Sequence, residues 1–594
     1  MLQFLTFDPM IPNSGNPIRR RSARSAMIMV LTLLTTAPAV QAQPRAEDNT
    51  TPTWNEAIAA FTALASEHPE RASMAPFGKS DVGRPLHLFT MGPDSAGLHI
   101  LVNNAIHPGE PCGVNASIEW ATALLENPEG LPEDVRIGIV PMYNVGGGLR
   151  RNCCTRANQN GPEEYGFRGN ARNLDLNRDF IKCDSRNALS FNAMFTDFAP
   201  DIFVDTHTSN GADYQPAITL ISTQPDKLGG ELGTWMEQEF DPLLYSGMSD
   251  AGHDMIPYVN SLGTTPDEKG ICDFLETPRY STGYGALHHA IGYTTEAHML
   301  KSFPERVAAT RAFLDVLLHQ AIPKAADIRR LRNEQHAAFV ALDETPVSWS
   351  LDTTAIDHVE FPGYEARFEW SSITGEKRLR YDHEAPFSRS IPRLHTYTAD
   401  RMTRVPGAFI VPQAWRHVIE RLEANRVRYH RIPKDTTWVV ETAHIIRHKA
   451  SSRPYEGHHY RTVEEVERRM ESVSLYQGDL VIPVDQPAAR YLVETLSPEG
   501  VDAFMAWNFF DSALQQKEYF SSYVFEETAV QLLESDPELK EAFEEAKSSA
   551  SQDAPWSARR QLDWIYRHSP HFEQTPSRYP VFFIPKGKAI PFHE

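Results

Sequence analysis

Strand-like and helix-like segments alternate through the first half of the chain, and this alternation constrains the fold more than any other feature. Short apolar runs bounded by turn residues predict strands, and longer runs with apolar residues every three or four positions predict helices. An alternating order is typical of an α/β sheet with helices on its faces. The predicted strands are 98–104, 135–142, 202–206 and 291–296, with two strand-like pieces in 77–90, and the predicted helices are 54–65, 112–125, 186–198, 227–240 and 304–317.

Three of these predicted strands end in side chains that can bind a metal ion. His107 and Glu110 follow the first, His207 follows the third, and Glu296 ends the last. Active sites of such sheets gather at the carboxyl ends of the strands. A catalytic zinc site needs three protein ligands, an open position and a general base beside it. A lone His or Glu is more often structural, so it is the conjunction that predicts a zinc site.

A fourth segment carries an amide beside a guanidinium. Asn177 and Arg178 follow a Leu-Asp-Leu run. An arginine with an adjacent amide is well shaped to hold a carboxylate through paired hydrogen bonds. The alternative is a surface segment in which Arg178 forms an ordinary salt bridge.

The order of these motifs resembles that of the zinc carboxypeptidase family, the carboxypeptidase A-like metallocarboxypeptidases. His107-Pro-Gly-Glu110, Asp175-Leu-Asn177-Arg178, His207 and Glu296 occur in the family's order, and the two histidines are 100 residues apart. The resemblance covers residues 52–323. It implies an α/β fold with a mixed central β-sheet and helices on both faces.

The resemblance also implies roles for individual residues. His107, Glu110 and His207 would hold one Zn²⁺ ion, and Glu296 would activate a water molecule as the general base. Asn177 and Arg178 would bind the terminal carboxylate of a peptide or peptide-like substrate.

Two further roles stay open between several residues. The family uses an arginine upstream of Asn-Arg to polarise the scissile carbonyl, and the run 149–156 offers Arg151 and Arg156, with Arg150 as a third choice. The family's mobile tyrosine would be Tyr280, with Tyr284 as the second choice.

The first 42 residues resemble an export signal. Four arginines precede a short apolar core at 26–34, and small residues at 37–42 fit cleavage after Ala42. The alternative is a membrane anchor, but the apolar core is too short to span a bilayer comfortably. We therefore expect an exported protein, periplasmic or extracellular, with no stable membrane insertion after cleavage.

Charge and cysteine content exclude some classes of partner and site. The net charge is −21, and without residues 1–42, which carry four Arg and one Asp, it would be −24. Such an acidic chain lacks the basic patch that binding of nucleic acid requires.

Five cysteines allow at most two disulfides, with the pairing open, and no Cys-x-x-Cys motif supports a cysteine zinc site.

The remainder, residues 327–594, has a different pattern and forms a predicted accessory region. It begins with alternating polar and apolar residues typical of antiparallel strands and ends in helices, so it could comprise two subdomains. The polar, Pro-bearing stretches near 386–393 and 547–556 are predicted as loops or linkers. His444 and His448 raise the alternative of a second metal site, although four-apart residues on a strand are well separated.

Three functional hypotheses follow. The first is an exported zinc carboxypeptidase that hydrolyses the C-terminal amide bond of peptides. The second is a deacylase or amidase that acts on an N-acyl amino acid or a cell-wall peptide with the same zinc site. The third is a non-catalytic peptide-binding protein, against which the intact set of His107, Glu110, His207 and Glu296 argues. The oligomeric state is left open.

Overall fold

The computed structural model describes residues 44–549, 555–573 and 575–589. The predicted export signal, residues 1–42, lies outside these ranges. Within them, no helix has both the length and the apolar character that crossing a bilayer requires.

A mixed eight-stranded sheet organises the first half of the chain. Its strand order is β1-β2-β4-β3-β5-β9-β6-β7. The outer pairs β1/β2, β2/β4 and β6/β9 are antiparallel, whereas β4, β3, β5 and β9 run parallel. The strands are β1 Ala72–Lys79, β2 Pro85–Met91, β3 Leu98–Asn103, β4 Val135–Val140, β5 Ile202–Thr208, β6 Ile218–Ser222, β7 Met255–Pro257 and β9 Ile291–Ala297. The predicted α/β fold class is confirmed.

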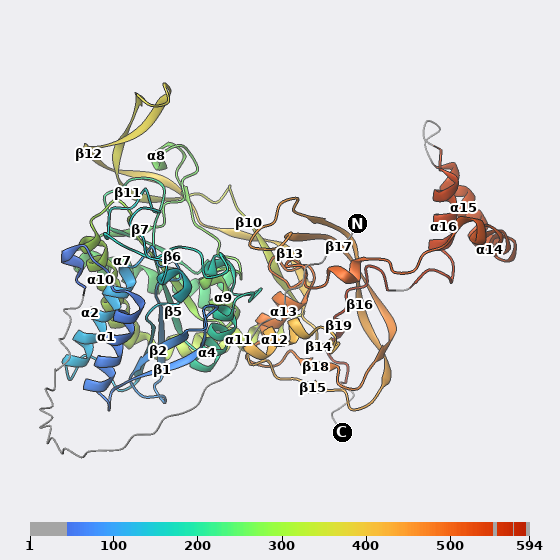
Figure 1. Ribbon diagram of the computed structural model, residues 1–594, viewed down its shortest axis with the longest axis horizontal. Coiled ribbons are helices and arrows are strands. Elements are labelled where there is room, and N and C mark those ends of the chain that lie inside the picture. Colours follow the sequence, from blue (N-terminus) through green and yellow to red (C-terminus); the bar gives the residue numbers. More distant parts are fainter. Residues whose placement is uncertain (1–43, 550–554, 574, 590–594) are drawn as a thin grey trace, which may run out of the picture. The chain divides into compact units, whose positions relative to one another are not determined.

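Helices cover both faces of this sheet. Figure 1 shows α1, α2, α7 and α10 on one face and α4, α9 and α11 on the other. Apolar side chains of the central strands and these helices form one large core, in which most side chains are fully buried. The helices are α1 Trp54–Glu67, α2 Cys112–Glu126, α4 Arg186–Phe198, α7 Asp241–Asp250, α9 Ser281–Leu287, α10 Phe303–Ala321 and α11 Ala325–Ala341.

The parallel centre of the sheet brings the predicted site together. β5 lies between β3 and β9, and the Cα of His207 pairs with that of Glu296 across the β5/β9 ladder. Because parallel neighbours end at the same edge, the segments after β3, β5 and β9 meet there.

The predicted helix over 227–240 is broken. The chain forms α5 Pro225–Leu228, α6 Gly230–Trp235 and a π-helical turn over Met236–Phe240 before α7 begins. Gly229 and Gly230 have φ values of +84° and +58°, which a continuous α-helix does not allow. Apolar residues recur at helical spacing through 227–240, but two adjacent glycines with positive φ interrupt the helix.

The second half forms further sheets, one of which includes β8 of the first half. A six-stranded sheet has the order β15-β18-β14-β19-β16-β17, a pair joins β10 to β13, and β11, β12 and β8 form a third sheet. The strands are β8 Ile271–Cys272, β10 Glu344–Leu351, β11 Asp357–Trp370, β12 Lys377–Leu394, β13 Tyr397–Arg404, β14 Ala408–Val411, β15 His430–Arg431, β16 Thr436–Ala450, β17 Arg461–Leu475, β18 Leu480–Pro483 and β19 Phe582–Ile584. The helices are α12 Arg416–Ala424, α13 Ala489–Leu496, α14 Ser522–Ser535, α15 Pro537–Ser548 and α16 Ala558–Arg567.

The predicted loop at 386–393 is wrong, because these residues belong to β12. Pro386 and Pro392 face Tyr364 and His358 on β11. On its other side β12 pairs with β8 only through Arg393 and Leu394. A strand with one largely free edge tolerates proline, because the missing N–H removes no hydrogen bond to a second neighbouring strand.

The two halves share secondary structure. β8 belongs to the first half and β12 to the second, and they pair in parallel.

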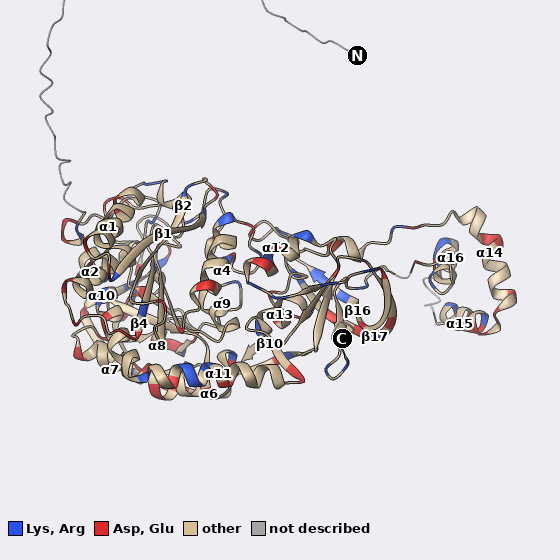
Figure 2. Ribbon diagram, turned by 90° about the horizontal axis from the view of Figure 1, so that it is seen from below, with Lys and Arg blue, Asp and Glu red and all other residues tan. Residues whose placement is uncertain are grey.

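In Figure 2, acidic and basic segments alternate along the described ribbon of both halves. The exclusion of nucleic acid stays a prediction.

Candidate metal centre and active site

The turn after β3 is shaped to present His107 and Glu110. Ala105 has φ +53°, so the chain reverses sharply between the strand and His107. Three residues after Glu110, Gly113 lies in the first turn of α2, where a Cβ would be 2.0 Å from Thr206 Oγ1 of β5. This close approach of α2 to β5 brings Glu110 beside His207.

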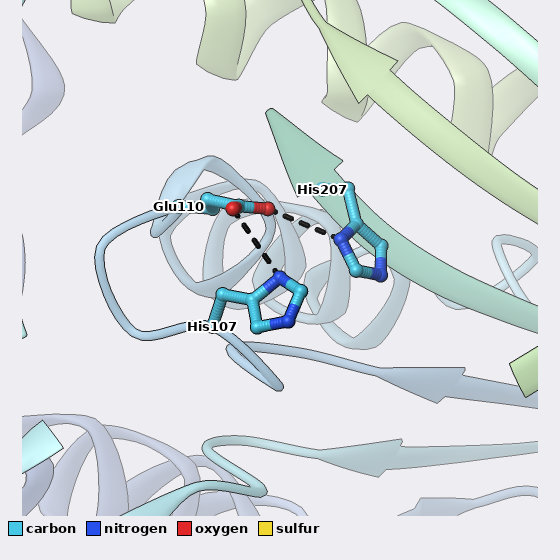
Figure 3. A group of neighbouring side chains, drawn as sticks. All are labelled: His107, Glu110 and His207. Carbon is cyan, nitrogen blue, oxygen red and sulfur yellow. Dashed lines mark hydrogen bonds and ion pairs between the residues drawn. The ribbon is translucent and has the colours of Figure 1, made fainter. Parts of the chain in front are cut away.

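The carboxylate of Glu110 contacts both histidines (Figure 3). His107 Nδ1 is 3.2 Å from Glu110 Oε1, and His207 Nδ1 is 3.1 Å from Glu110 Oε2. All three side chains are buried, and one ligand atom from each lies within 4.8 Å of the others. The predicted ligand residues therefore converge on one point.

Two aspartates set the orientation of the imidazoles. Asp175 Oδ1 accepts a hydrogen bond from His107 Nε2 at 2.8 Å, and Asp205 Oδ2 accepts one from His207 Nε2 at 3.0 Å. Carboxylates that accept from Nε2–H leave the lone pair of each Nδ1 directed at Glu110.

This donor set fits a divalent cation. When both imidazoles are neutral, two nitrogen lone pairs and a carboxylate face one another, and each is an acceptor. His107 Nδ1 is buried and has no hydrogen-bond donor beside it. Two nitrogens and an oxygen are the ligand types that catalytic zinc uses. Among the described residues no other group of three His, Cys, Asp or Glu side chains converges in this way.

The electrostatic effects at the site follow from this crowding. Burial alone would raise the pKa of Glu110, but the charges of His107 and Arg156 outweigh it and hold the pKa well below its usual value. Burial would lower the pKa of His207, but Asp205 and Glu110 hold it well above its usual value. A centre that attracts positive charge this strongly is suited to a metal ion.

Glu296 extends from β9 into the same cavity. Burial raises the pKa of its carboxyl to about 8, Glu110 and Glu276 add to the rise, and His207 and Arg168 oppose it. A cation bound nearby would stabilise the ionised carboxylate and so lower the pKa of Glu296 towards neutral pH. A carboxylate that titrates near neutral pH is suited to general acid–base chemistry.

The cavity has a volume of about 680 Å³ and is lined by most of the predicted site residues. Arg156 lines it and its Nη1 lies 2.9 Å from Glu110 Oε1. The guanidinium of Arg151 instead donates to the backbone carbonyls of Thr51, Pro52 and Glu164. Of the arginines in this run, the structure places Arg156 in the cavity and Arg151 outside it.

Arg150, the third choice, donates to the carbonyls of Asn170 and Ala171. It does not line the cavity either.

Asn177, Arg178 and Tyr280 lie together on the cavity wall. Arg178 Cζ lies 4.2 Å from the centre of the Tyr280 ring, and Asn177 Oδ1 accepts from the backbone N–H of Ser281. Tyr284 is fully buried and donates to Asn425 Oδ1. The tyrosine at the cavity is therefore Tyr280.

Four functional residues were missed by the sequence reasoning. Asp175 and Asp205 hold the histidines, and Glu276 lines the cavity. Arg168 lines it too and forms ion pairs of 3.3 Å with Glu110 and 2.9 Å with Asp175. For the aspartates a signal existed, because Asp175 belongs to the Asp-x-Asn-Arg motif and Asp205 lies two residues before His207 on the same strand. Nothing in the local sequence distinguishes Arg168 or Glu276.

The contacts also bear on the second metal site that His444 and His448 could have formed. His444 pairs with Glu471 at 3.0 Å, and His448 accepts from Arg461, so the two histidines face different partners.

Cys153 and Cys154 form a disulfide between adjacent residues. Cys112, Cys183 and Cys272 are buried free thiols.

Comparison with known proteins supports one family. Residues 58–208 match the family model described as zinc carboxypeptidase. The chain is 22% identical over 449 residues to Carboxypeptidase 2 of Trichophyton rubrum, covering 70% of this chain and 74% of that protein. It is 21% identical over 448 residues to Carboxypeptidase 2 of Trichophyton equinum, with the same coverage.

Solved structures of carboxypeptidases also align with part of the chain. A metallo-carboxypeptidase from Burkholderia cenocepacia aligns with 17% identity and a TM-score of 0.34, covering 45% of this chain and 69% of that one. A metallo-carboxypeptidase from Pseudomonas aeruginosa aligns with 15% identity and a TM-score of 0.34, covering 44% and 68%.

The matched segment begins in α1 and ends with β5, so it contains His107, Glu110 and His207. The curated relatives extend the similarity into the second half of the chain. Over residues 58–208 this chain thus matches the zinc carboxypeptidase family, a family of metallopeptidases, and the curated relatives are named carboxypeptidases.

Proposed function

We propose that the protein is an exported carboxypeptidase that removes the C-terminal residue of peptides with the help of one zinc ion. The observation that carries the proposal is the convergence of three parallel strand ends. They place His107, Glu110, His207 and Glu296 around one cavity whose wall also holds Asn177 and Arg178.

The metal would be held by His107, Glu110 and His207. When bound, zinc supplies Lewis acidity, which polarises a carbonyl oxygen and makes water a nucleophile at neutral pH. Asp175 and Asp205 keep the Nδ1 atoms free for ligation, because each carboxylate accepts from the Nε2–H of its histidine.

The residues around the centre would divide the remaining work. Arg178 and Asn177 would hold the terminal carboxylate of the substrate. Arg156 would donate to the scissile carbonyl oxygen as negative charge develops there. Glu296 would take a proton from the attacking water and return it to the leaving amine.

Export belongs to the proposal because of the sequence of residues 1–42, with its arginines, apolar core and small residues. We also propose 52–323 as the catalytic domain and 327–594 as a region that accompanies it.

A matched set of substrates tests the proposal. An N-blocked peptide with a free C-terminal carboxylate should lose its last residue, while the same peptide with a C-terminal amide should be cut at least about tenfold more slowly, because the charged partner of Arg178 is missing. Mass spectrometry of both reactions identifies the products.

The deacylase hypothesis predicts another result, because an N-acyl amino acid also carries a carboxylate that Asn177 and Arg178 could hold. Rapid release of the acyl group from such a substrate, with the peptide left intact, would overturn the carboxypeptidase proposal in favour of the deacylase. Binding of the peptide without any cleavage would support the non-catalytic hypothesis.

A further inference from the structure

A tight turn from the second half of the chain contacts the segment that carries Asn177 and Arg178. The turn comprises Tyr455, Glu456, Gly457 and His458, between β16 and β17. The N–H of Tyr455 donates to the carbonyl of His458 at 2.7 Å, and the reverse bond is 3.0 Å. Glu456 and Gly457 have φ values of +49° and +86°. Two successive positive φ values between such a pair are typical of a two-residue hairpin turn.

Two side chains of the turn bind this segment directly. Glu456 Oε2 accepts from the backbone N–H of Asp175 at 2.9 Å. Tyr455 Oη accepts from Arg178 Nε at 3.1 Å. The segment 175–178 therefore donates one hydrogen bond at each end. Both acceptors belong to residues about 280 positions later in the chain.

The turn is itself fixed in place. His458 Nε2 donates to Asp184 Oδ2 at 2.7 Å, and the same carboxylate oxygen accepts from Lys182 Nζ at 3.1 Å. The ring of Tyr455 stacks on Trp507 with a centroid distance of 6.2 Å. A turn held at both ends can transmit a fixed orientation to the segment it contacts.

Glu456 is an unusual residue for its position. A non-glycine residue at positive φ is strained, and glycine would remove that strain. The turn alone therefore favours glycine, whereas the hydrogen bond to Asp175 requires the carboxylate. The backbone strain and the side-chain contact can be separated by substitution.

The contacts determine how Arg178 can present its guanidinium. Nε donates to Tyr455, and Nη1 donates to the carbonyl of Asn177 at 2.7 Å. With these two N–H groups engaged, Nη2 and the second N–H of Nη1 are the donors available for a substrate carboxylate. Asp175, whose backbone N–H donates to Glu456, in turn orients His107 through its side chain.

We propose that Tyr455 and Glu456 are positioning residues for the substrate's terminal carboxylate: Tyr455 orients Arg178, and Glu456 holds residues 175–178 in place. The inference rests on the proposed carboxypeptidase function. It makes the second half of the chain a contributor to substrate binding.

The first variant that tests the proposal removes the hydroxyl oxygen of Tyr455. Tyr455→Phe should raise KM for a peptide with a free C-terminal carboxylate roughly 3- to 10-fold, as expected for one lost hydrogen bond to a charged group, with kcat within about twofold. For the same peptide with a C-terminal amide, kcat/KM should change less than about twofold, because the carboxylate contact is absent there.

Tyr460→Phe is the matched control. Tyr460 packs against the same Trp507, but its hydroxyl donates to the carbonyl of Val501 and does not reach Arg178. It should leave KM for the free-carboxylate peptide within about twofold of the wild type, whatever it does to the melting temperature.

The Glu456 arm separates backbone strain from side-chain function. Glu456→Gly should keep or raise the melting temperature, because glycine relaxes the positive φ, and yet raise KM several-fold. Glu456→Gln retains an acceptor oxygen and should restore most of the wild-type KM.

Each outcome is decisive. If the wild type trims peptides while Tyr455→Phe and Glu456→Gly keep its KM, the positioning role is wrong and the turn is structural only. A KM rise that Tyr460→Phe shares equally would also overturn it. If the wild type releases no C-terminal residue, the proposed function itself fails, which is a different result.

Discussion

At the scale of single residues, the proposed metal centre depends on the acceptors that hold the histidines as much as on the residues proposed as ligands. Asp205 Oδ2 accepts from His207 Nε2, and Asp205 Oδ1 accepts from Asn103 Nδ2 at 3.0 Å. The carboxylate is therefore fixed on both sides. An orienting carboxylate makes its histidine a better ligand.

Asp205→Asn should consequently weaken zinc binding roughly 10- to 100-fold, because the neutral amide no longer raises the basicity of His207. Competition with a chromogenic chelator measures the dissociation constant. Glu276→Gln is the control, since Glu276 lines the same cavity but bonds to Thr282 instead of a ligand. Equal zinc affinity in Asp205→Asn and wild type would contradict the orienting role.

The two arginines that the sequence left undecided should separate in kinetics. Arg156→Ala should lower kcat roughly 10²- to 10³-fold, as loss of a donor to developing oxyanion charge does. Arg151→Ala should leave kcat within about twofold but lower the melting temperature, because three backbone carbonyls lose their donor. Steady-state kinetics and thermal melts on both variants decide this, and the reverse order of kcat losses would refute the assignment.

At the scale of secondary-structure elements, three of them meet at one buried carboxyl group. Asp241 begins α7, accepts from Ser222 of β6 at 2.7 Å and accepts from Tyr293 of β9 at 2.8 Å. Burial raises the pKa of Asp241 to about 6, and these two hydrogen bonds oppose the rise without cancelling it.

The sign of the pH effect follows from this shift. Between the ordinary carboxyl pKa and about 6, the folded protein holds a proton that the unfolded chain has lost, so stability falls as pH rises through this window. Above pH 6 the ionised group costs up to about 3 kcal/mol.

Asp241→Asn should therefore raise the melting temperature at pH 8, and the gain should vanish near pH 4. The amide keeps an acceptor for Tyr293 and offers a donor to Ser222. Asp315→Asn on the surface of α10 is the control, expected to have little effect at either pH. A gain that is the same at pH 4 and pH 8 would show that charge is not the cause.

The elements also show what could be predicted from sequence. His107, His207 and Glu296 could be predicted because each lies at or just after the end of a strand that its local sequence pattern indicates. Parallel strands of one sheet then place these ends side by side. The break at Gly229 and Gly230 was missed because glycine is also tolerated inside helices, and β12 was missed because its prolines are acceptable only on a free edge.

Long-range contacts account for the rest. Arg168 is defined as a site residue by Glu110, 58 residues earlier, and Arg178 is oriented by Tyr455, 277 residues later. Such pairings arise from the fold of the whole chain, so no local pattern predicts them.

At the scale of the whole molecule, the second half is bound to the first by buried polar contacts. Lys227 Nζ lies 3.3 Å from Glu494 Oε2, and Arg490 Nε donates to Glu494 Oε1 at 2.7 Å. Arg421 donates to the carbonyls of Lys182 and Cys183. Removing one side would leave buried charges and carbonyls without partners, which is strongly destabilising.

A chain ending at residue 341 should therefore fail to fold to a soluble, cooperatively melting protein, although it contains the whole family-matched segment. The control shortens the chain elsewhere: residues 367–380, the exposed end of the β11/β12 hairpin, are replaced by Asn-Gly, which should fold and retain activity. A soluble chain 43–341 with wild-type peptidase activity would show that the second half is dispensable.

The most direct test of the account measures zinc content and peptide trimming on the same samples of wild type and Glu296→Gln. We expect about one zinc per chain in both, stepwise loss of C-terminal residues by the wild type, and turnover lowered by at least roughly 10²-fold in the variant, because Glu296 moves the proton but does not bind the metal. Trimming by Glu296→Gln at the wild-type rate, or by a zinc-free wild type, would contradict the central claim.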